Sequence, residues 1–133
     1  HCMLMSIQEA GLTHDDVDFI NAHGTSTMAN DEKETLAIKK HLGDRAKDII
    51  ITANKSIIGH MRGAAGVVEG IFTAKSLQTG DVPSTSNHEE RDPECDLDYT
   101  PKHVRNATVK IALSNTFGFG GINGTLLFKK WEG

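Results

Sequence analysis

Residues that could do chemistry gather in three short stretches of the sequence, and each stretch follows a run of residues typical of a strand. The first stretch, residues 21–27, contains His23, and the second, residues 54–60, contains Lys55. The third stretch is the glycine-rich segment 114–121. In an open α/β sheet, ligands gather at the carboxyl ends of the strands. If the strands before these stretches are parallel, the three stretches converge on one site.

Each stretch also has an ordinary structural interpretation. A single histidine such as His23 is more often a packing residue than a catalyst, and Lys55 alone would be a solvated charge. Residues 118–124 do not form a dinucleotide fingerprint, because such a fingerprint must open a helix and a β-rich segment follows here. Residues 59–66 lack the Gly-Lys-Ser/Thr ending of a phosphate loop. The chain has no HExxH motif, which argues against a catalytic zinc site.

The strands that would position these stretches are predicted from short apolar runs. Residues 17–20 alternate in polarity, and residues 49–52 are β-branched and continuous, as in a strand that is buried on both faces. Residues 108–113 and 124–130 predict two further strands around the third stretch. Strands that alternate with helices indicate an α/β sheet covered on both faces.

The helices are predicted from their stop signals and their apolar positions. One helix ends near Gly11, and Asn30 is expected to cap a second helix that stops at Gly43. Residues 63–78 are apolar nearly all the way round, which predicts a helix buried in the middle of a layered protein. Residues 80–93 read as a long irregular connection.

The composition is that of an ordinary globular protein, with 38% hydrophobic and 24% charged residues among 133. The net charge of −4 comes from interspersed charges, which argues against a nucleic-acid surface. No apolar run approaches the roughly 18 residues of a membrane span. Cys2 and Cys95 have no zinc spacing and are taken as free thiols. Residues 1–133 fit one domain or one half of a larger one. The expected location is the cytoplasm, or a plastid or mitochondrion if the source is eukaryotic.

Together the motifs resemble those of the C-terminal half of the elongating β-ketoacyl-acyl-carrier-protein synthases, condensing enzymes of the thiolase superfamily. The residues that match, in the family's order and at about its spacing, are Asn21-Ala22-His23-Gly24-Thr25-Ser26-Thr27, Lys55-Ser56, Gly59-His60, Gly63-Ala64-Ala65-Gly66, Asn115 and Phe117-Gly118-Phe119-Gly120-Gly121. The resemblance implies the C-terminal half of a thiolase-like fold, layered αβαβα, with a mixed sheet and a buried helix. It also implies that an N-terminal half, which carries the nucleophilic cysteine, is absent from this chain.

The resemblance further implies an acyltransferase reaction, the decarboxylative Claisen condensation of malonyl carrier protein with an acyl-enzyme thioester in fatty acid or polyketide elongation. His23 and His60 would donate N–H bonds to the enolate that decarboxylation creates. Lys55 would tune the neighbouring groups. Thr25 and Thr27 would hold the phosphopantetheine arm, which the partner acyl carrier protein supplies, although two hydroxyls that only cap a loop remain an alternative.

Three further expectations follow from the resemblance. Phe119 would be a gate beside the cysteine, made flexible by its flanking glycines, and Phe117 a second aromatic residue of the same loop. Glu69 is the odd residue in its apolar helix, because an unpaired buried carboxylate is costly. The candidate ligands of a bound sodium or potassium ion in the family's pattern are Asn21, Ala22, Glu69, Ser114 and Asn115. A structural role for Glu69, through hydrogen bonds to Lys55 or water, is the alternative.

Neither cysteine has the setting of the family's nucleophile, which opens a buried helix that lowers its pKa. Cys95 lies between Glu94 and Asp96, whose charges would raise the pKa of its thiol. We therefore expect the isolated chain to be inactive, to expose a surface meant for the missing half, and to form a homodimer only within the full protein. The alternatives are a non-catalytic subunit like a chain-length factor, and an assembly or carrier-protein-binding module.

Overall fold

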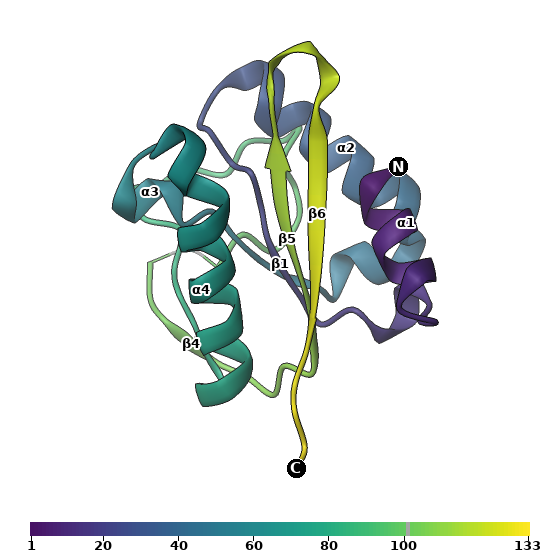
Figure 1. The fold of residues 1–133 in the computed structure, drawn as a ribbon. Coiled ribbons are helices and arrows are strands. Elements are labelled where there is room, and N and C mark those ends of the chain that lie inside the picture. The colour runs from purple at the N-terminus through teal and green to yellow at the C-terminus, as the bar shows by residue number, and fades with distance from the viewer. Residues whose placement is uncertain (101) are drawn as a thin grey trace.

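Four strands form one mixed sheet at the centre of the computed structural model, which describes residues 1–100 and 102–133 (Figure 1). In spatial order the strands are β2 (Ile50–Thr52), β1 (Phe19–Asn21), β5 (Ile111–Phe117) and β6 (Asn123–Lys129). β1 pairs in parallel with both β2 and β5, whereas β6 pairs antiparallel with β5. The predicted α/β class with a mixed sheet is confirmed.

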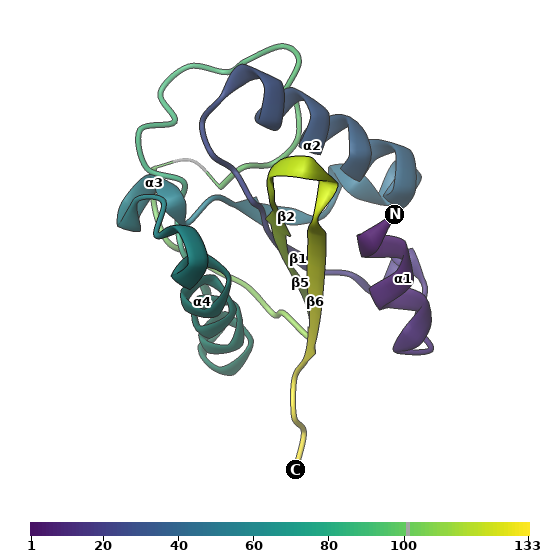
Figure 2. The same cartoon turned by 45° about the horizontal axis from the view of Figure 1, so that its top comes forward.

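Helices cover both faces of this sheet, as the view along it shows (Figure 2). One face carries α1 (Cys2–Glu9) and α2 (Met28–Leu42). The other carries α4 (Ala65–Thr79), which is preceded by the short α3 (Lys55–Ile58).

Successive strand residues point to opposite faces of a sheet, so each strand contributes to two cores. Ile20 and Leu113 belong to the larger core, together with residues of α1 and α2. Phe19 and Ala112 belong to a smaller core with Leu77 of α4. The sheet is therefore held between two apolar layers, and its strand ends are fixed in place.

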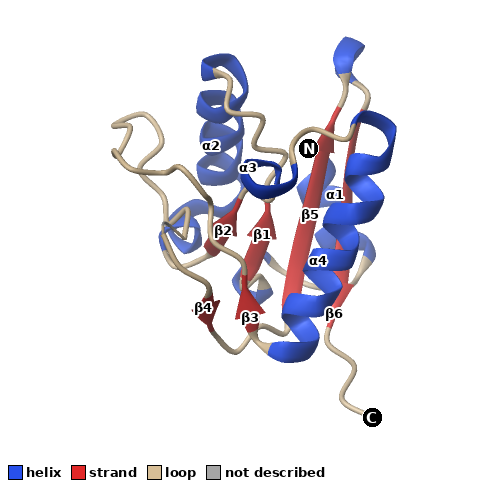
Figure 3. Cartoon of the chain, turned by 90° about the vertical axis from the view of Figure 1, so that its left-hand side faces the viewer, coloured by secondary structure: helices blue, strands red, loops and turns tan. Residues whose placement is uncertain are grey.

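A two-stranded ribbon of β3 (Asp81–Val82) and β4 (Arg105–Asn106) lies beside the main sheet (Figure 3). Residues 83–93 are irregular, as predicted, whereas residues 81–82 of the predicted connection form β3. The connection is tied to the sheet where the Ile51 N–H donates to the Asp98 carbonyl at 2.8 Å. Single 3₁₀ turns occur at His14–Asp16, Gly43–Lys47, Arg62–Ala64 and Phe119–Gly121.

The largest differences from the predicted boundaries occur at α2 and β5. α2 begins three residues early, because Thr27 is its N-cap and accepts a hydrogen bond from the Asn30 N–H. β5 runs on to Phe117, so that Ser114 and Asn115 lie within the strand, because β6 pairs with β5 along its whole length.

The prediction that the apolar helix is buried on all sides was also wrong for this chain. Glu69 and Thr73 face inward on α4, but Val67 is 69% exposed and Ile71 is 59% exposed. No part of the described chain covers that side of the helix. In the part of the chain that the structure describes, no helix combines the length and the apolar character needed to cross a membrane.

Candidate active site

The carboxyl ends of three parallel strands meet at one edge of the sheet. Asn21 at the end of β1 is in register with Thr52 of β2 on one side and with Ser114 of β5 on the other. The stretches that follow β1 and β2 therefore leave the sheet side by side, next to the end of β5. The predicted convergence of the three stretches is confirmed.

His23 lies at the centre of this edge, with only 5% of its surface exposed. Its ring centroid lies 5.7 Å from that of His60, with the two rings nearly perpendicular, and 5.5 Å from that of Phe117. The Lys55 Nζ lies 3.3 Å from the His23 Nδ1. Burial, followed by the charges of Lys55 and His60, lowers the pKa of His23 to about 4. The His23 imidazole is therefore neutral at neutral pH.

Hydrogen bonds assign the same tautomer to both imidazoles. A lysine ammonium group can only donate, so the His23 Nδ1 beside Lys55 must accept, and the ring proton sits on Nε2. The Nδ1 of His60 accepts from the backbone N–H of Arg62 at 3.0 Å, which places the proton of the neutral ring on Nε2 as well. His60 is exposed, unlike His23. The structure thus brings together two imidazoles that can donate from Nε2.

Lys55, at the start of α3, makes a buried ion pair with Glu69 of α4. The Lys55 Nζ lies 2.5 Å from the Glu69 Oε1, and both side chains are at least 96% buried. Burial raises the pKa of Glu69, although the hydrogen bond and the charge of Lys55 oppose that shift. The hydrogen bond to Lys55 that the structural alternative for Glu69 expects is present, and the pair fixes Lys55 beside His23.

Glu34 is a buried acid of the site that the sequence analysis missed. It is 5% exposed and accepts hydrogen bonds from the backbone N–H groups of His23 at 2.9 Å and Gly24 at 3.0 Å. Burial raises the pKa of Glu34, against the effect of these hydrogen bonds. One signal was available: Glu34 stands four and eight residues before Ile38 and Leu42, which places it on the buried face of α2.

The proposed cation ligands lie close to the ion pair, but most of their polar atoms are already engaged. Asn21 donates to the Glu69 carbonyl at 3.0 Å and to Thr73 at 3.2 Å. Asn115 donates to Glu34 and accepts from Thr125, while Ala22 and Ser114 are buried nearby. The Oδ1 of Asn21 and the Oε2 of Glu69 are buried and have no hydrogen-bond partner among the described residues. Oxygen atoms of this type suit a hard cation. The cation site stays a prediction.

The two threonines of the first stretch bond to each other, with 3.0 Å between their hydroxyl oxygens. Thr27 is exposed and caps α2, and Thr25 is half-buried. The capping alternative is therefore confirmed for Thr27. The predicted contact of both hydroxyls with a phosphopantetheine arm stays a prediction.

The two phenylalanines of the glycine-rich stretch lie in different settings. Phe117 ends β5 half-buried against His23. Phe119 is fully exposed in a tight turn whose next residues, Gly120 and Gly121, both have positive φ angles. Glycine adopts such angles without strain, which explains why the tight turn forms at these two residues. The gating role of Phe119 and Phe117 stays a prediction.

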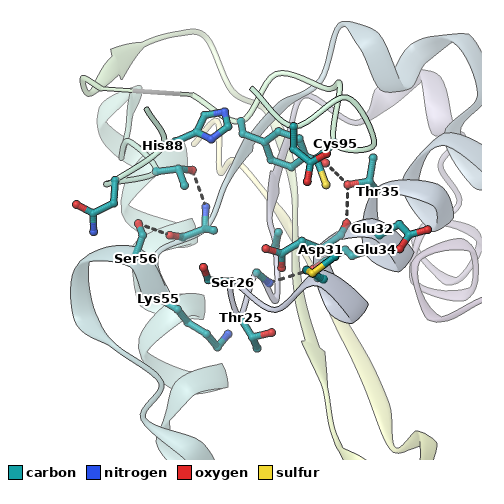
Figure 4. Close-up of a pocket in the computed structure, with 18 of the residues that line it drawn as sticks. Thr25, Ser26, Asp31, Glu32, Glu34, Thr35, Lys55, Ser56, His88 and Cys95 are labelled. Carbon is teal, nitrogen blue, oxygen red and sulfur yellow. Dashed lines mark hydrogen bonds between the residues drawn. The ribbon is translucent and has the colours of Figure 1, made fainter. Parts of the chain in front are cut away.

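A cavity of about 700 Å³ opens beside the site, between the start of α2, the Lys55 region and the connection after β3 (Figure 4). Cys95 lies on its wall. Burial first, and then the charges of Asp92, Asp31 and Glu32, raise the pKa of the Cys95 thiol. The predicted direction is confirmed, but its cause is mainly burial and acids other than the neighbours in sequence. Such a thiol is a poor nucleophile at neutral pH.

The sequence of this chain is similar to those of known proteins. The family model described as "Beta-ketoacyl synthase, C-terminal domain" matches residues 1–89. The 3-oxoacyl-[acyl-carrier-protein] synthase 2 of Synechocystis sp. is 49% identical over 96% of this chain and 30% of its own length. Nodulation protein E of Rhizobium meliloti is 47% identical over 96% of this chain and 32% of its own length.

A solved structure gives the same result for the fold. A type II PKS ketosynthase, solved in complex with its acyl-carrier protein, superposes with a TM-score of 0.96 and 35% identity, over 98% of this chain and 32% of that chain. The thiolase-like fold is therefore confirmed. The chain spans about a third of the length of the relatives that it matches. By its sequence, its fold and the arrangement of its histidines, this chain belongs to the β-ketoacyl synthase family, within the C-terminal domain.

Proposed function

We propose that the protein to which this chain belongs is a β-ketoacyl-acyl-carrier-protein synthase, which condenses malonyl carrier protein with an acyl-enzyme thioester. The observation that carries the proposal is the pair of imidazoles beside a buried lysine. His23 and His60 both accept at Nδ1 and both keep the Nε2 proton. This arrangement supplies two N–H donors at one site, without a base that would remove a proton from the substrate.

Such a pair suits the decarboxylation step. When a malonyl thioester loses carbon dioxide, the electron pair of the broken carbon–carbon bond stays on the substrate, and negative charge builds on the thioester oxygen. Donors aimed at that oxygen stabilise the charge. The enolate carbon then attacks the carbonyl of the acyl group on a cysteine, and the cysteine leaves as a thiolate. Lys55 would set the electrostatic environment of both imidazoles.

The attacking cysteine would come from an N-terminal half encoded upstream, because the thiol of Cys95 has a raised pKa and Cys2, the half-buried first residue of α1, is not one of the residues that line the cavity. An acyl carrier protein would be the partner, since it carries the phosphopantetheine arm that Thr25 and Thr27 would hold. We also propose a homodimer in the full protein and a cytoplasmic location. The solved complex of a related ketosynthase with its acyl-carrier protein supports this choice of partner.

The test is the full reading frame, including any sequence upstream of His1, assayed for release of carbon dioxide from malonyl carrier protein and for condensation. His23→Ala and His60→Ala should each lower decarboxylation by roughly 10²- to 10³-fold, the cost of a lost oxyanion donor. His14→Ala, at an exposed histidine, is the matched control and should retain the full rate. Wild-type rates in both site variants would refute the proposal.

The outcome of the same assay also separates the alternatives. Carbon dioxide release without condensation, from a protein that lacks an upstream cysteine, would identify a subunit like a chain-length factor. Carrier-protein binding with neither reaction would identify a binding module.

We also propose a sodium or potassium ion at Asn21, Ala22, Glu69, Ser114 and Asn115. The unpartnered oxygens of Asn21 and Glu69 support it. Crystals of the full protein soaked in rubidium or thallium salts should show an anomalous peak within about 3 Å of these oxygens. Water at hydrogen-bond distances and no peak would reject the ion.

A further inference from the structure

Arg62 carries a positive charge next to the two imidazoles and uses it for no contact within the described chain. Its backbone N–H donates to the Nδ1 of His60 at 3.0 Å, so its main chain lies against that ring. Arg62 is exposed, and among the described residues its guanidinium group takes part in no hydrogen bond or ion pair. Its neighbours in sequence, Met61 and Gly63, are uncharged.

The main chain of Arg62 has a conformation that favours glycine. Its φ angle is +51°, in the left-handed region, which is costly for a residue with a Cβ atom. A glycine at this position would form the same turn without strain and would keep the N–H that donates to His60. Neither the turn nor that hydrogen bond therefore explains an arginine, and strained residues of this kind cluster at sites that bind ligands.

His60 adjoins both Arg62 and the cavity beside the site. It lines the cavity together with Thr25, whereas Arg62 does not line it. A phosphopantetheine arm held by Thr25 would reach the imidazoles through this cavity. The arm and the carboxylate of a malonyl thioester are attached to opposite sides of the thioester carbonyl, so the carboxylate would lie beyond the imidazoles, outside the cavity.

The charges around the site favour the same placement of the carboxylate. The cavity wall carries five acids, namely Asp31, Glu32, Glu90, Asp92 and Glu94. Their negative charges would repel a malonyl carboxylate. Lys55 is not available to attract it, because its Nζ is buried against Glu69 and His23. Arg62 is available, and its planar guanidinium group can bind a carboxylate through two parallel hydrogen bonds.

We propose that Arg62 binds the carboxylate of the malonyl group before decarboxylation, and thereby selects malonyl carrier protein over carrier proteins whose acyl group has no carboxylate. This inference rests on the proposed function, since it assigns a residue to one group of the same substrate. When the carbon–carbon bond breaks, its electron pair stays on the enolate and carbon dioxide leaves uncharged. Arg62 then loses its partner, so it stabilises the bound substrate rather than the transition state.

The test uses the full-length protein and separates KM from kcat. Arg62→Gln should raise the KM of malonyl decarboxylation by roughly 10- to 100-fold, the value of a hydrogen bond to a charged group, and should leave kcat at or above the wild-type value. Transfer of an acyl group from its carrier protein to the enzyme involves no carboxylate and should keep its rate. Arg91→Gln removes another exposed arginine and should alter none of these readouts.

A second variant guards against misfolding. Arg62→Gly removes the guanidinium group and relieves the left-handed φ angle, so it should fold at least as well as the wild type and show the same rise in KM. An unchanged KM in both variants would overturn the proposal. If the free energy of unfolding fell while KM stayed unchanged, Arg62 would instead pair with an acid elsewhere in the full protein, which would also overturn it.

Binding of unreactive analogues tests Arg62 independently of catalysis. The probes are malonyl- and acetyl-pantetheine amides, in which NH replaces the thioester sulfur, measured by isothermal titration calorimetry. The wild type should bind the malonyl amide more tightly, and Arg62→Gln should bind both amides alike. Equal binding by the wild type, or a malonyl preference that survives in the variant, would contradict the role of Arg62. If the wild type shows no decarboxylation, the proposed function fails, but the two amides still decide whether Arg62 binds the carboxylate.

Discussion

The ion pair of Lys55 and Glu69 is the strongest electrostatic constraint at the scale of single residues. Removal of one partner leaves an uncompensated charge in the interior. We predict that Lys55→Met lowers the free energy of unfolding of the full protein by about 3–5 kcal/mol, as measured by urea denaturation. The double variant Lys55→Met/Glu69→Leu should recover most of this loss, because no buried charge remains. A single variant that costs less than about 1 kcal/mol would contradict the buried pair.

The protonation of His23 gives a second prediction at this scale. Its pKa is lowered to about 4, from an ordinary value of 6.5. Between these values the unfolded chain binds a proton that the folded chain does not, so this histidine removes stability as the pH falls from 6.5 to about 4. A titration of the His23 ¹⁵N signals in the full protein should have its midpoint near 4, and in 6 M urea near 6.5. A folded midpoint above 6 would contradict the buried, neutral imidazole.

Single residues differed in how far the sequence could predict them. His23, Lys55 and His60 stand in short motifs with fixed spacing, and the structure places them together. Glu34 was missed because its role depends on hydrogen bonds from the stretch that follows β1 and from Asn115 of β5. Such contacts exist only once the fold is formed.

At the scale of elements, Thr27 makes two side-chain contacts at the start of α2. Its side chain accepts from the Asn30 N–H, and its hydroxyl lies 3.0 Å from that of Thr25. We predict that Thr27→Ala lowers the free energy of unfolding by about 1 kcal/mol, the value of an N-cap. Thr27→Ser keeps the hydroxyl and should retain the stability. Thermal unfolding of the full protein tests both.

A third variant, Thr27→Asp, separates the capping role of Thr27 from a substrate role. If Thr27 also holds the phosphopantetheine arm, Thr27→Asp, which caps well but adds charge, should keep the stability and raise the KM for malonyl carrier protein. An unchanged KM in all three variants would limit Thr27 to capping.

Elements were predictable where one signal dominated and unpredictable where several residues competed. Residues 49–52 are β-branched and continuous, a pattern typical of a buried strand, and β2 occupies nearly that range. At the start of α2, Thr27 and Asn30 are both good caps, and only the path of the chain leaving β1 selects Thr27. The length of β5 was likewise set by its partner β6 rather than by its own residues.

At the scale of the whole molecule, the apolar character of α4 has no explanation within this chain. The residues that α4 buries are mostly small or polar, with Leu77 as the one large apolar side chain among them: Ala65, Glu69, Gly70, Thr73, Ser76 and Leu77. Val67 and Ile71 are exposed. A helix that needed only this sheet would have the opposite pattern, with apolar residues inward. The residues of α4 therefore fit a protein in which both sides of the helix are covered, and relatives about three times as long as this chain have the material to cover it.

The exposed apolar face of α4 predicts how the chain behaves without the rest of the protein. Because Val67 and Ile71 lie one turn apart on an exposed face, the isolated chain should self-associate, which sedimentation velocity would detect as a sedimentation coefficient that rises with concentration. Val67→Glu/Ile71→Lys should restore the monomer, whereas Leu36→Lys on α2, where a single leucine is exposed, should have little effect. No form of the chain should condense substrates.

In the full protein the same double substitution should instead impair folding, because the helix face that tolerates charge in the isolated chain would then have to be buried. A monomeric isolated chain, or a full protein indifferent to the double substitution, would show that α4 is exposed in the native molecule as well.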